Sequence, residues 1–493
     1  MTRGAALVGA LGALALAGCT AVGPDYAGPP AGAVARTAAA AGPFVGGEPV
    51  FSRADAPADW WRLYQDPRLD DLIRQAFAAN TDLRVAAANL ERSQALLREA
   101  RVARQPGVAL RAGAGYAEMS GEAHLIGRPL PPNFAYDASF DVSYEVDLFG
   151  RLRRGVEAAS AQDEAVQAAY DLVRVTVAAD VARAYADACG AGAELAVARR
   201  SLALQAQSAQ ATRRLRQAGR ATDLDVARTS VQVAQLQAAL PTFRAAQRNA
   251  LFRLAALTGA PPAAYPPDVE GCAVPPRLDA PLPVGNGAGL LRRRPDIRAA
   301  EREIAAATAR VGVATADLYP AVRLDLSAIS TGLLADALSP ATNGYRLIPG
   351  LSWRLNRNAA RARIAGANAD VTARVARFDG VVLNALRETE SALNTYAEDS
   401  QREAALETAR RQAGIAAGHA ERLYRAGKTD FLSLLDAQRS QASAESVLAA
   451  AWRQLSDDQV AVFLALGGGW ESAASARPAR VPPPPGALAA PPL

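Results

Sequence analysis

Two stretches of the chain alternate strictly between apolar and polar residues. Residues 136–147 place aromatic and aliphatic side chains between Asp, Ser and Glu, and residues 345–356 place them mostly between Arg, Ser and Asn. Residues 108–116 and 322–328 show the same period more weakly. Because successive side chains of a strand point to opposite faces, a period of two predicts four strands, each with an apolar and a polar face.

The flanking segments have a helical period instead. We expect helices over residues 82–105 and 150–217, followed by a turn at Gly219 and a return helix that runs to residue 257. In the second half, apolar residues step by threes, fours and sevens, as in a heptad seam: Ile364, Val371, Val375, Phe378, Val382, Ala385, Ala392 and Tyr396. Such a seam predicts long, near-parallel helices that pack against one another.

The same order of elements occurs twice. Residues 80–106 align without a gap on residues 294–320, and residues 214–226 align on residues 422–434, with Gly219 on Gly427. Two copies of one unit are therefore expected, joined by a Pro/Gly-rich segment. The predicted organisation is a signal peptide (1–18), a lipidated extended segment (19–58), a first repeat (59–258), a linker (259–289), a second repeat (290–470) and a disordered Pro/Ala-rich tail (471–493).

Residues 1–18 resemble a signal peptide, with Arg3 before an apolar core that is too short to span a bilayer. The sequence Leu-Ala-Gly-Cys at residues 16–19 resembles a bacterial lipobox, in which the thiol of Cys19 is diacylated and the chain is cleaved before it. Thr20 follows the cysteine, which by the rule for such proteins implies sorting to the outer membrane. An ordinary signal peptide with a chance cysteine is the alternative.

A membrane location changes the interpretation of the strands. No later stretch reaches about 18 uninterrupted apolar residues, so a crossing of the membrane must use strands. Four strands cannot close a barrel, since the smallest membrane barrels have about eight, and open edges in lipid are costly. We therefore expect a barrel that is shared between subunits. A soluble, half-buried sheet has the same alternation, but the lipobox and the long helices favour the membrane.

Composition excludes several functional classes. The 493 residues carry 54 Lys+Arg and 49 Asp+Glu, a net charge of +5 spread along the chain, which is not the clustered basic surface of a nucleic-acid-binding protein. Two histidines and three cysteines are too few for the usual zinc, haem or iron–sulfur sites, so no metal or cofactor is expected. No nucleophile–base constellation is visible, and an enzyme is not expected.

Several motifs follow one another over residues 19–470: CTAVGPDYAGPP (19–30), WWRLYQDPRLDDLIRQAFAANTDLRVAA (60–87), YEVDLFGRLRRGVEAA (144–159), LLRRRPDIRAAEREIAAA (290–307), AGKTDFLSLLDAQRS (426–440) and ALGGGW (465–470). In this order they resemble the TolC-like outer-membrane efflux proteins, in their NodT-type lipoprotein branch. The departure from that family is SWRLNRNAARARIAG at residues 352–366, where the family usually has an aromatic residue and paired glycines before the helix.

The resemblance implies a mainly α fold with a membrane β-barrel. Each chain would contribute four strands to a shared twelve-stranded barrel of a homotrimer, and its helices to a periplasmic α-helical barrel. The protein would be lipid-anchored in the outer membrane and dock on a periplasmic adaptor (membrane fusion) protein and an inner-membrane pump. It would be a passive duct for drugs or other small molecules. A type I protein secretion duct and a coiled-coil structural lipoprotein are the alternatives.

The resemblance also implies a periplasmic gate just after the second turn, at positions matching Leu432, Asp436 and Arg439, with Asp225 as the acidic position of the first half. Three copies of Asp436 around an axis would form a ring that attracts cations. Arg439 is expected to pair with Asp436 or with a neighbouring chain, and Leu432 to form an apolar constriction. An ordinary exposed pair of Asp436 and Arg439 is the alternative.

Residues at the two turns are candidates for contact with the adaptor. Gly219 and Gly427 are expected to adopt backbone conformations that need no Cβ, and Arg220, Lys428 and Thr429 lie beside them. A solvated helix tip is the alternative for these three residues.

The remaining cysteines invite a disulfide. A return helix of about 34 residues ends level with Cys189, and Cys272 lies in the linker that begins there. The oxidising periplasm permits a bond between them. Two buried free thiols are the alternative.

Overall fold

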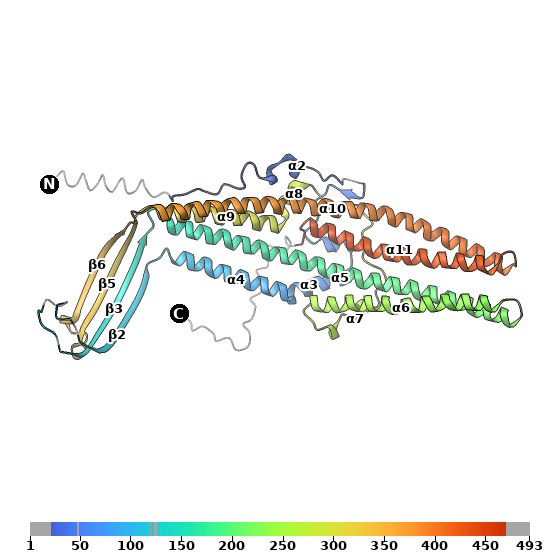
Figure 1. The fold of residues 1–493 in the computed structure, drawn as a ribbon, viewed down its shortest axis with the longest axis horizontal. Helices are drawn as coiled ribbons and strands as arrows, with labels where there is room; N and C mark the ends of the chain where they lie inside the picture. Colours follow the sequence, from blue (N-terminus) through green and yellow to red (C-terminus); the bar gives the residue numbers. More distant parts are fainter. Residues whose placement is uncertain (1–20, 47–48, 119, 123–125, 130, 470–493) are drawn as a thin grey trace. The chain divides into compact units, whose positions relative to one another are not determined.

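The computed structural model describes residues 21–469 except 47–48, 119, 123–125 and 130. The predicted signal peptide, Cys19 and the C-terminal tail 471–493 lie outside the described residues. Two successive halves contain the same elements in the same order (Figure 1). They are α3 (Pro67–Ala79), α4 (Thr81–Val102), β2 (Gly107–Ala117), β3 (Asn133–Val146), α5 (Arg151–Gln217) and α6 (Asp223–Leu257), and then α8 (Gly287–Arg293), α9 (Pro295–Ala316), β5 (Ala321–Leu333), β6 (Asn343–Ser352), α10 (Asn358–Arg425) and α11 (Phe431–Ala465).

The chain divides into two compact units. The strand unit comprises Leu90–Val166 and Ala299–Phe378 together with the chain up to Pro30, and the turn unit comprises Ala31–Asn89, Gln167–Arg298 and the chain from Asp379. Helices α4, α5, α9 and α10 contribute residues to both units. No helix in the described part of the chain is long and apolar enough to cross a membrane.

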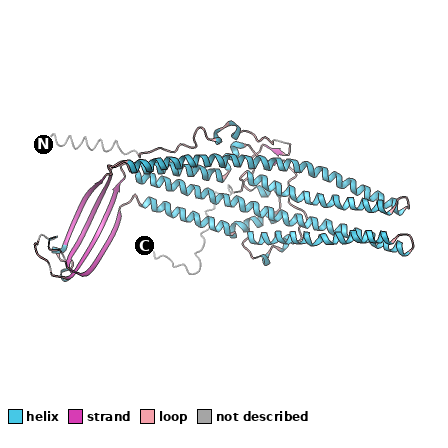
Figure 2. Cartoon of the chain, in the orientation of Figure 1, coloured by secondary structure: helices cyan, strands magenta, loops and turns pink. Residues whose placement is uncertain are grey.

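In the strand unit, the four strands form one antiparallel sheet in the order β2-β3-β5-β6 (Figure 2). The register places Leu110 opposite Phe140, and Leu326 between Val142 and Leu347. Directly paired residues lie on the same face of a sheet, so these apolar side chains share one face. Leu110 is 78% exposed and Leu347 is 60% exposed. This apolar face is therefore uncovered within the chain.

The other face of the sheet is polar. Asp141 accepts hydrogen bonds from Ser327 (2.7 Å), Ser139 (2.8 Å) and Arg111 (2.9 Å) on three adjacent strands. Among the described residues, β2 and β6 are each paired along one edge only. Both therefore offer unpaired backbone groups to another chain.

Strand β6 ends earlier than the alternation predicts, at Ser352 instead of residue 356. Ser352 pairs with Ala321, the first residue of β5, and Pro320 before it has no backbone N–H to extend the ladder. The indole of Trp353 donates to the Leu318 carbonyl oxygen at 3.0 Å, outside the sheet.

The junction between β3 and α5 fastens the N-terminal segment to the strand unit. Both carboxylate oxygens of Asp147 accept backbone hydrogen bonds from the first turn of α5, at 3.1 and 2.8 Å. The guanidinium of Arg154 has a side-chain exposure of 4% and donates to the carbonyl oxygens of Val22 (3.1 Å) and Gly23 (3.2 Å). It also pairs with Asp25 at 2.6 Å. Val22, Gly23 and Asp25 are thereby held at the start of α5.

In the turn unit, aligned residues of the two repeats form the same kind of hydrogen bond to the end of a helix. The Asn80 side chain donates to the carbonyl oxygen of Leu257, the last residue of α6, at 3.0 Å. Arg294, which aligns with Asn80, donates to the carbonyl oxygen of Ala465, the last residue of α11, at 2.8 Å. Each contact satisfies one of the carbonyls that a helix end leaves unpaired.

The core of the turn unit joins the beginning and the end of the described chain. The ring of Trp60 is fully buried and stacks on Phe463 with centroids 4.9 Å apart. Gly468 packs against Trp60 and Gly469 against Trp61, so that a Cβ atom at either glycine would lie 3.4 Å from an indole. Gly467 and Gly469 also have positive φ angles of 70° and 117°, which favour glycine at these two positions of the ALGGGW motif.

Candidate functional site: the helix turns and the start of α11

The turns α5–α6 and α10–α11 have the same backbone geometry. Gly219 has a φ of 73° and Gly427 a φ of 69°, in the left-handed region that favours glycine. Arg220 N–H bonds to the Leu215 carbonyl and Lys428 N–H to the Leu423 carbonyl, both at 2.8 Å. These are the long hydrogen bonds of a Schellman helix end. Arg220 and Lys428 therefore follow their helices at equivalent positions.

The first turn of α6 is closed by a capping box. Asp225 N–H donates to the Thr222 hydroxyl at 3.2 Å, and the Asp225 carboxylate accepts from the backbone and hydroxyl of Thr222 at 3.0 and 2.7 Å. These hydrogen bonds, the backbone one first, hold the pKa of Asp225 below its usual range. Asp225, which the resemblance places at the gate, thus also caps the N-terminal end of α6.

Helix α11 begins with a similar cap. The carboxylate of Asp430 accepts a 2.8 Å hydrogen bond from Ser433 N–H, and its bonds to Ser433 lower the pKa of Asp430. Thr429 stands directly before this cap and is half-exposed. Our sequence reasoning missed Thr222 and Asp430. The signal was present, because an Asp or Thr three residues before a polar side chain is a common start of a helix.

One face of α11 carries the predicted gate residues. Leu432, Asp436 and Arg439 are all exposed, and their spacing of four and three places them on one side of the helix. Leu434 and Leu435 are buried on the other side. Asp436 makes no hydrogen bond or ion pair within the described part of the chain. The structure therefore groups the three residues and leaves the carboxylate free.

Arg439 contacts a different partner from the one expected within the chain. Its Nε donates to the Oε1 atom of Gln232 on α6 at 2.8 Å, and the described residues show no ion pair with Asp436. Next to it, the Ser208 hydroxyl on α5 donates to Gln438 at 3.1 Å. Side-chain hydrogen bonds thus tie the start of α11 to both helices of the first turn. Nothing in the local sequence identified Gln232, because the contact depends on how the two hairpins pack.

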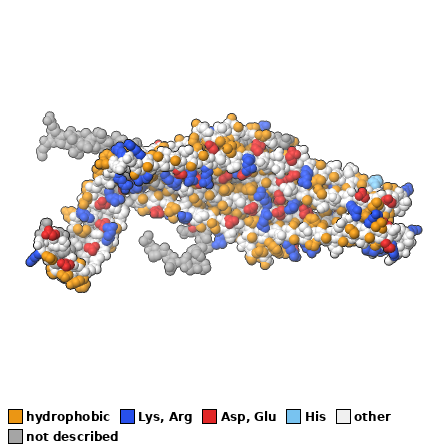
Figure 3. Space-filling model, in the orientation of Figure 1, with side chains coloured by type: hydrophobic (Ala, Val, Ile, Leu, Met, Phe, Trp, Pro, Cys, Tyr) orange, Lys and Arg blue, Asp and Glu red, His pale blue; other side chains and the backbone are white. Residues whose placement is uncertain are grey.

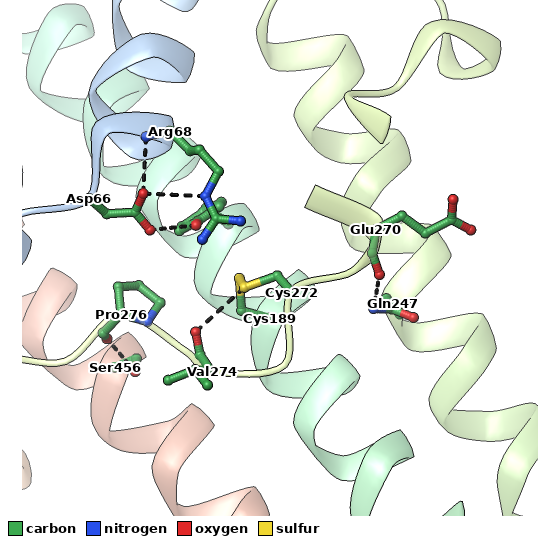
Figure 4. The surroundings of a disulfide bond; sticks show 10 residues. Asp66, Arg68, Cys189, Gln247, Glu270, Cys272, Val274, Pro276 and Ser456 are labelled. Carbon is green, nitrogen blue, oxygen red and sulfur yellow. Dashed lines mark hydrogen bonds and ion pairs between the residues drawn. A yellow bond between two sulfur atoms is a disulfide. The ribbon is translucent and has the colours of Figure 1, made fainter. Parts of the chain in front are cut away.

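The linker crosses the turn unit and is held by a disulfide. Cys189 of α5 and Cys272 are bonded through their sulfur atoms, and Cys189 is fully buried (Figure 4). Gln247 of α6 donates to the Glu270 carbonyl at 3.0 Å, and Ser456 of α11 donates to the Pro276 carbonyl at 2.7 Å. The linker is therefore attached to helices of both repeats.

An acidic side chain, Asp457, follows Ser456 on α11. One carboxylate oxygen of Asp457 is buried and has no hydrogen-bond partner in the described residues. Burial and the neighbouring charge of Asp187 raise the pKa of Asp457 to about 7.

Across the described residues, no group of three or more His, Cys, Asp or Glu side chains could hold a metal ion.

These features define a class of protein. A sheet with an uncovered apolar face and two unpaired edges suits a chain that inserts into a membrane with others like it. The two long helical hairpins with exposed turns match the periplasmic helices that the family resemblance implies.

Comparison with known proteins agrees with this class. The model of the family described as "Outer membrane efflux protein" matches residues 72–260 and 289–468. The toluene efflux pump outer membrane protein TtgF of Pseudomonas putida is 32% identical over 476 residues, 94% of this chain and 96% of that protein. Nodulation protein T of Rhizobium leguminosarum bv. trifolii is 27% identical over 94% of this chain and 97% of its own length.

Solved structures show the same likeness. The outer-membrane channel OprN superposes with a TM-score of 0.83 and 36% identity, over 91% of this chain and 99% of that one. The MtrE outer membrane channel of Neisseria gonorrhoeae, in its open state, superposes with a TM-score of 0.79. It is 25% identical, over 92% of this chain and 99% of that one.

The chain belongs to the outer membrane efflux protein family. It is an outer-membrane channel protein of an efflux system, and its family is one of transport proteins. The fold class and the family expected from the sequence are confirmed.

Proposed function

We propose that three copies of this chain form the exit duct of a tripartite efflux system. The observation that carries the proposal is the sheet with one uncovered apolar face and two unpaired edges. An open edge in lipid leaves backbone groups without partners, at a cost of several kcal/mol for each group. Three copies, joined β6 to β2, would close twelve strands into one barrel.

The duct would receive its substrates from an inner-membrane pump through a periplasmic adaptor, and would itself catalyse no reaction. Relatives are named as parts of a toluene efflux pump and of an antibiotic efflux pump. We propose small organic molecules of this kind as substrates. The two turns, with Gly219, Arg220, Gly427, Lys428 and Thr429, would contact the adaptor.

Lipidation of Cys19 fits the way in which the N-terminal segment is held. Arg154 fixes the backbone of Val22 and Gly23 beside the junction of β3 and α5. In the proposed trimer, this junction lies where the barrel meets the periplasm. Acyl chains on Cys19 would then enter the inner leaflet of the outer membrane without stretching the chain.

The gate would be formed by the exposed face of α11. Three copies of Asp436 would stand around the axis, with Leu432 and Arg439 one turn to either side. The hydrogen bond from Arg439 to Gln232 would fix the start of α11 against α6 in each copy.

The test is single-channel conductance of the purified full-length protein in planar bilayers, after native mass spectrometry has established its oligomeric state. We expect a trimer with a small, cation-selective conductance. A well-folded monomer without conductance would contradict the duct.

A further inference from the structure

Exposed arginines lie at both edges of the four-stranded sheet, where its strands meet helices. At one edge, Arg101 and Arg104 come shortly before β2, whose first residue is Gly107. At the other edge, Arg357 and Arg361 follow β6, at the start of α10. All four side chains are exposed, and Figure 3 shows basic side chains gathered where the strands meet the helices.

These four arginines have no anionic partner within the described part of the chain. There, their side chains form no hydrogen bond or ion pair, and neither does the carboxylate of Glu99 on α4. The junction of β3 and α5 in the first repeat is different. Arg151 pairs there with Glu145 at 2.7 Å, and Arg154 pairs with Asp25 at 2.6 Å. The arginines at the two edges of the sheet are therefore available to a ligand from outside the chain.

The helix dipole accounts for only part of this charge. A cation is stabilised near the C-terminal end of a helix, which suits Arg101 in the last turn of α4. Arg357 and Arg361 lie at the N-terminal end of α10, where a cation is disfavoured and where the first turn holds no acidic residue. Their positions thus call for a negative charge from another molecule.

The arginines lie just beyond the end of the uncovered apolar face. Val108 near the start of β2 is 63% exposed, and Leu351 near the end of β6 is 70% exposed. Lipid tails that cover these two side chains would place their headgroups a few residues further along the chain, near Arg104 and Arg357. The guanidinium of Arg357 also lies over the ring of Trp353, 5.6 Å from its centroid, and tryptophan is enriched at membrane interfaces.

The topology brings the two pairs of arginines together in the proposed trimer. The register of the sheet places the start of β2 and the end of β6 at the same end of the strands. Where β6 of one copy pairs with β2 of the next, Arg357 and Arg361 of the first copy lie at the same level as Arg101 and Arg104 of the second. We call this line of contact between two copies the seam.

We propose that each seam binds the phosphate group of an anionic phospholipid from the inner leaflet of the outer membrane. This inference rests on the proposed function and adds a lipid site that is complete only where two copies meet. A guanidinium binds phosphate through its fork of N–H donors, and basic residues near a membrane surface attract anionic lipids. Two arginines from each copy would surround one headgroup.

The test uses the full-length protein in a neutral detergent. Phosphatidylglycerol or phosphatidylcholine with the same acyl chains is added, and native mass spectrometry counts the lipid molecules that stay bound to the trimer. The two lipids differ in the charge of the headgroup alone, so their ratio of affinities isolates the contribution of the arginines. Each titration is repeated at a higher salt concentration, and once with soluble glycerol phosphate as competitor.

Variants change either side of the seam. One carries Arg357→Glu and Arg361→Glu, and another carries Arg101→Glu and Arg104→Glu. Arg357→Gln with Arg361→Gln removes the charges without reversing them and keeps the test open if the glutamates prevent assembly. The matched control carries Arg244→Glu and Arg248→Glu, two exposed arginines of α6 with the spacing of Arg357 and Arg361.

We expect the wild type and the control to bind three phosphatidylglycerol molecules per trimer, about tenfold more tightly than phosphatidylcholine. This preference should shrink as salt screens the charges. Each glutamate variant should bind the two lipids about equally, because two glutamates neutralise the two arginines that remain at each seam. The glutamine variant should show a preference that is weaker than that of the wild type.

Three results would overturn the lipid site and leave the duct intact. The first is a wild-type trimer that binds both lipids equally. The second is a full preference in the Arg101→Glu/Arg104→Glu variant, since the neighbouring copy would then contribute nothing. The third is glycerol phosphate that displaces the lipid at equal concentration, since the acyl chains would then play no part. A monomeric wild type would instead contradict the trimer on which both proposals rest.

Discussion

At the scale of single residues, the carboxylates near the two turns differ in their hydrogen bonding. Asp225 and Asp430 hold helix ends through hydrogen bonds that keep their pKa values low. Asp436 has no partner in the described residues and stands on the exposed face of α11. In the proposed gate, Asp436 is therefore the carboxylate whose charge would act on a passing ion.

Replacing Asp436 with alanine should therefore change ion selectivity. In the proposed trimeric gate, the loss of three negative charges should lower the cation-over-anion permeability ratio about twofold or more. Reversal potentials in planar bilayers under a salt gradient measure this ratio. Glu398→Ala, at an exposed position of α10, is the control and should leave it unchanged. An Asp436→Ala channel with wild-type selectivity would remove this residue from the gate.

Asp457 should make stability depend on pH. Because its pKa in the folded protein is raised to about 7, the folded state keeps a proton that the unfolded chain releases near pH 4. Stability contributed by this group thus falls as pH rises from about 4 to about 7 and is constant above.

Asp457→Asn removes that titration. Its unfolding midpoint, measured by circular dichroism, should exceed that of the wild type by a margin that grows from pH 4 to pH 7. The control is Glu398→Gln, a substitution of the same kind at an exposed position of α10. If the unfolding midpoints of Asp457→Asn and wild type differed by the same amount at every pH from 4 to 7, the buried carboxyl would not titrate as described.

At the scale of elements, the linker connects helices of the two repeats, and the disulfide is its covalent part. Removing the bond in Cys189→Ser/Cys272→Ser should lower the free energy of unfolding by about 2–4 kcal/mol, mainly because the unfolded chain becomes less restricted. Wild type unfolded with a reductant should approach the double variant. Alkylation of both thiols in the native, non-reduced protein would show that the bond does not form.

Most of the helices, strands and turns could be predicted from the sequence. Strand alternation, the internal repeat and glycines at the turns follow from local patterns, and the helix bounds agree within a few residues. The contacts of Arg439 with Gln232 and of Trp60 with Phe463 were not readable, because each joins residues from different repeats. The early end of β6 was missed since it depends on where its partner strand begins.

At the scale of the whole molecule, the uncovered apolar face requires a lipid environment. A charge on that face should block insertion into the membrane. Leu110→Arg places a charge there, and near the bilayer midplane it costs about 2–4 kcal/mol of insertion free energy per chain. We expect little trimer in outer-membrane fractions. Ala109→Arg, one residue away on the polar face opposite Asp141, is the control and should assemble normally. Equal assembly of both variants would contradict a lipid-facing role for this surface.

The stacking of Trp60 on Phe463 also constrains the order of events during biogenesis. A chain that is exported from its N-terminus delivers Trp60 to the periplasm long before Phe463 arrives. Local hairpins can form meanwhile, but a core that depends on such distant residues is completed only after translocation ends. Until then the two tryptophans and the apolar strands remain without their final partners. We therefore expect a chain truncated before Phe463 to be degraded instead of assembled, which immunoblots of outer-membrane fractions would measure.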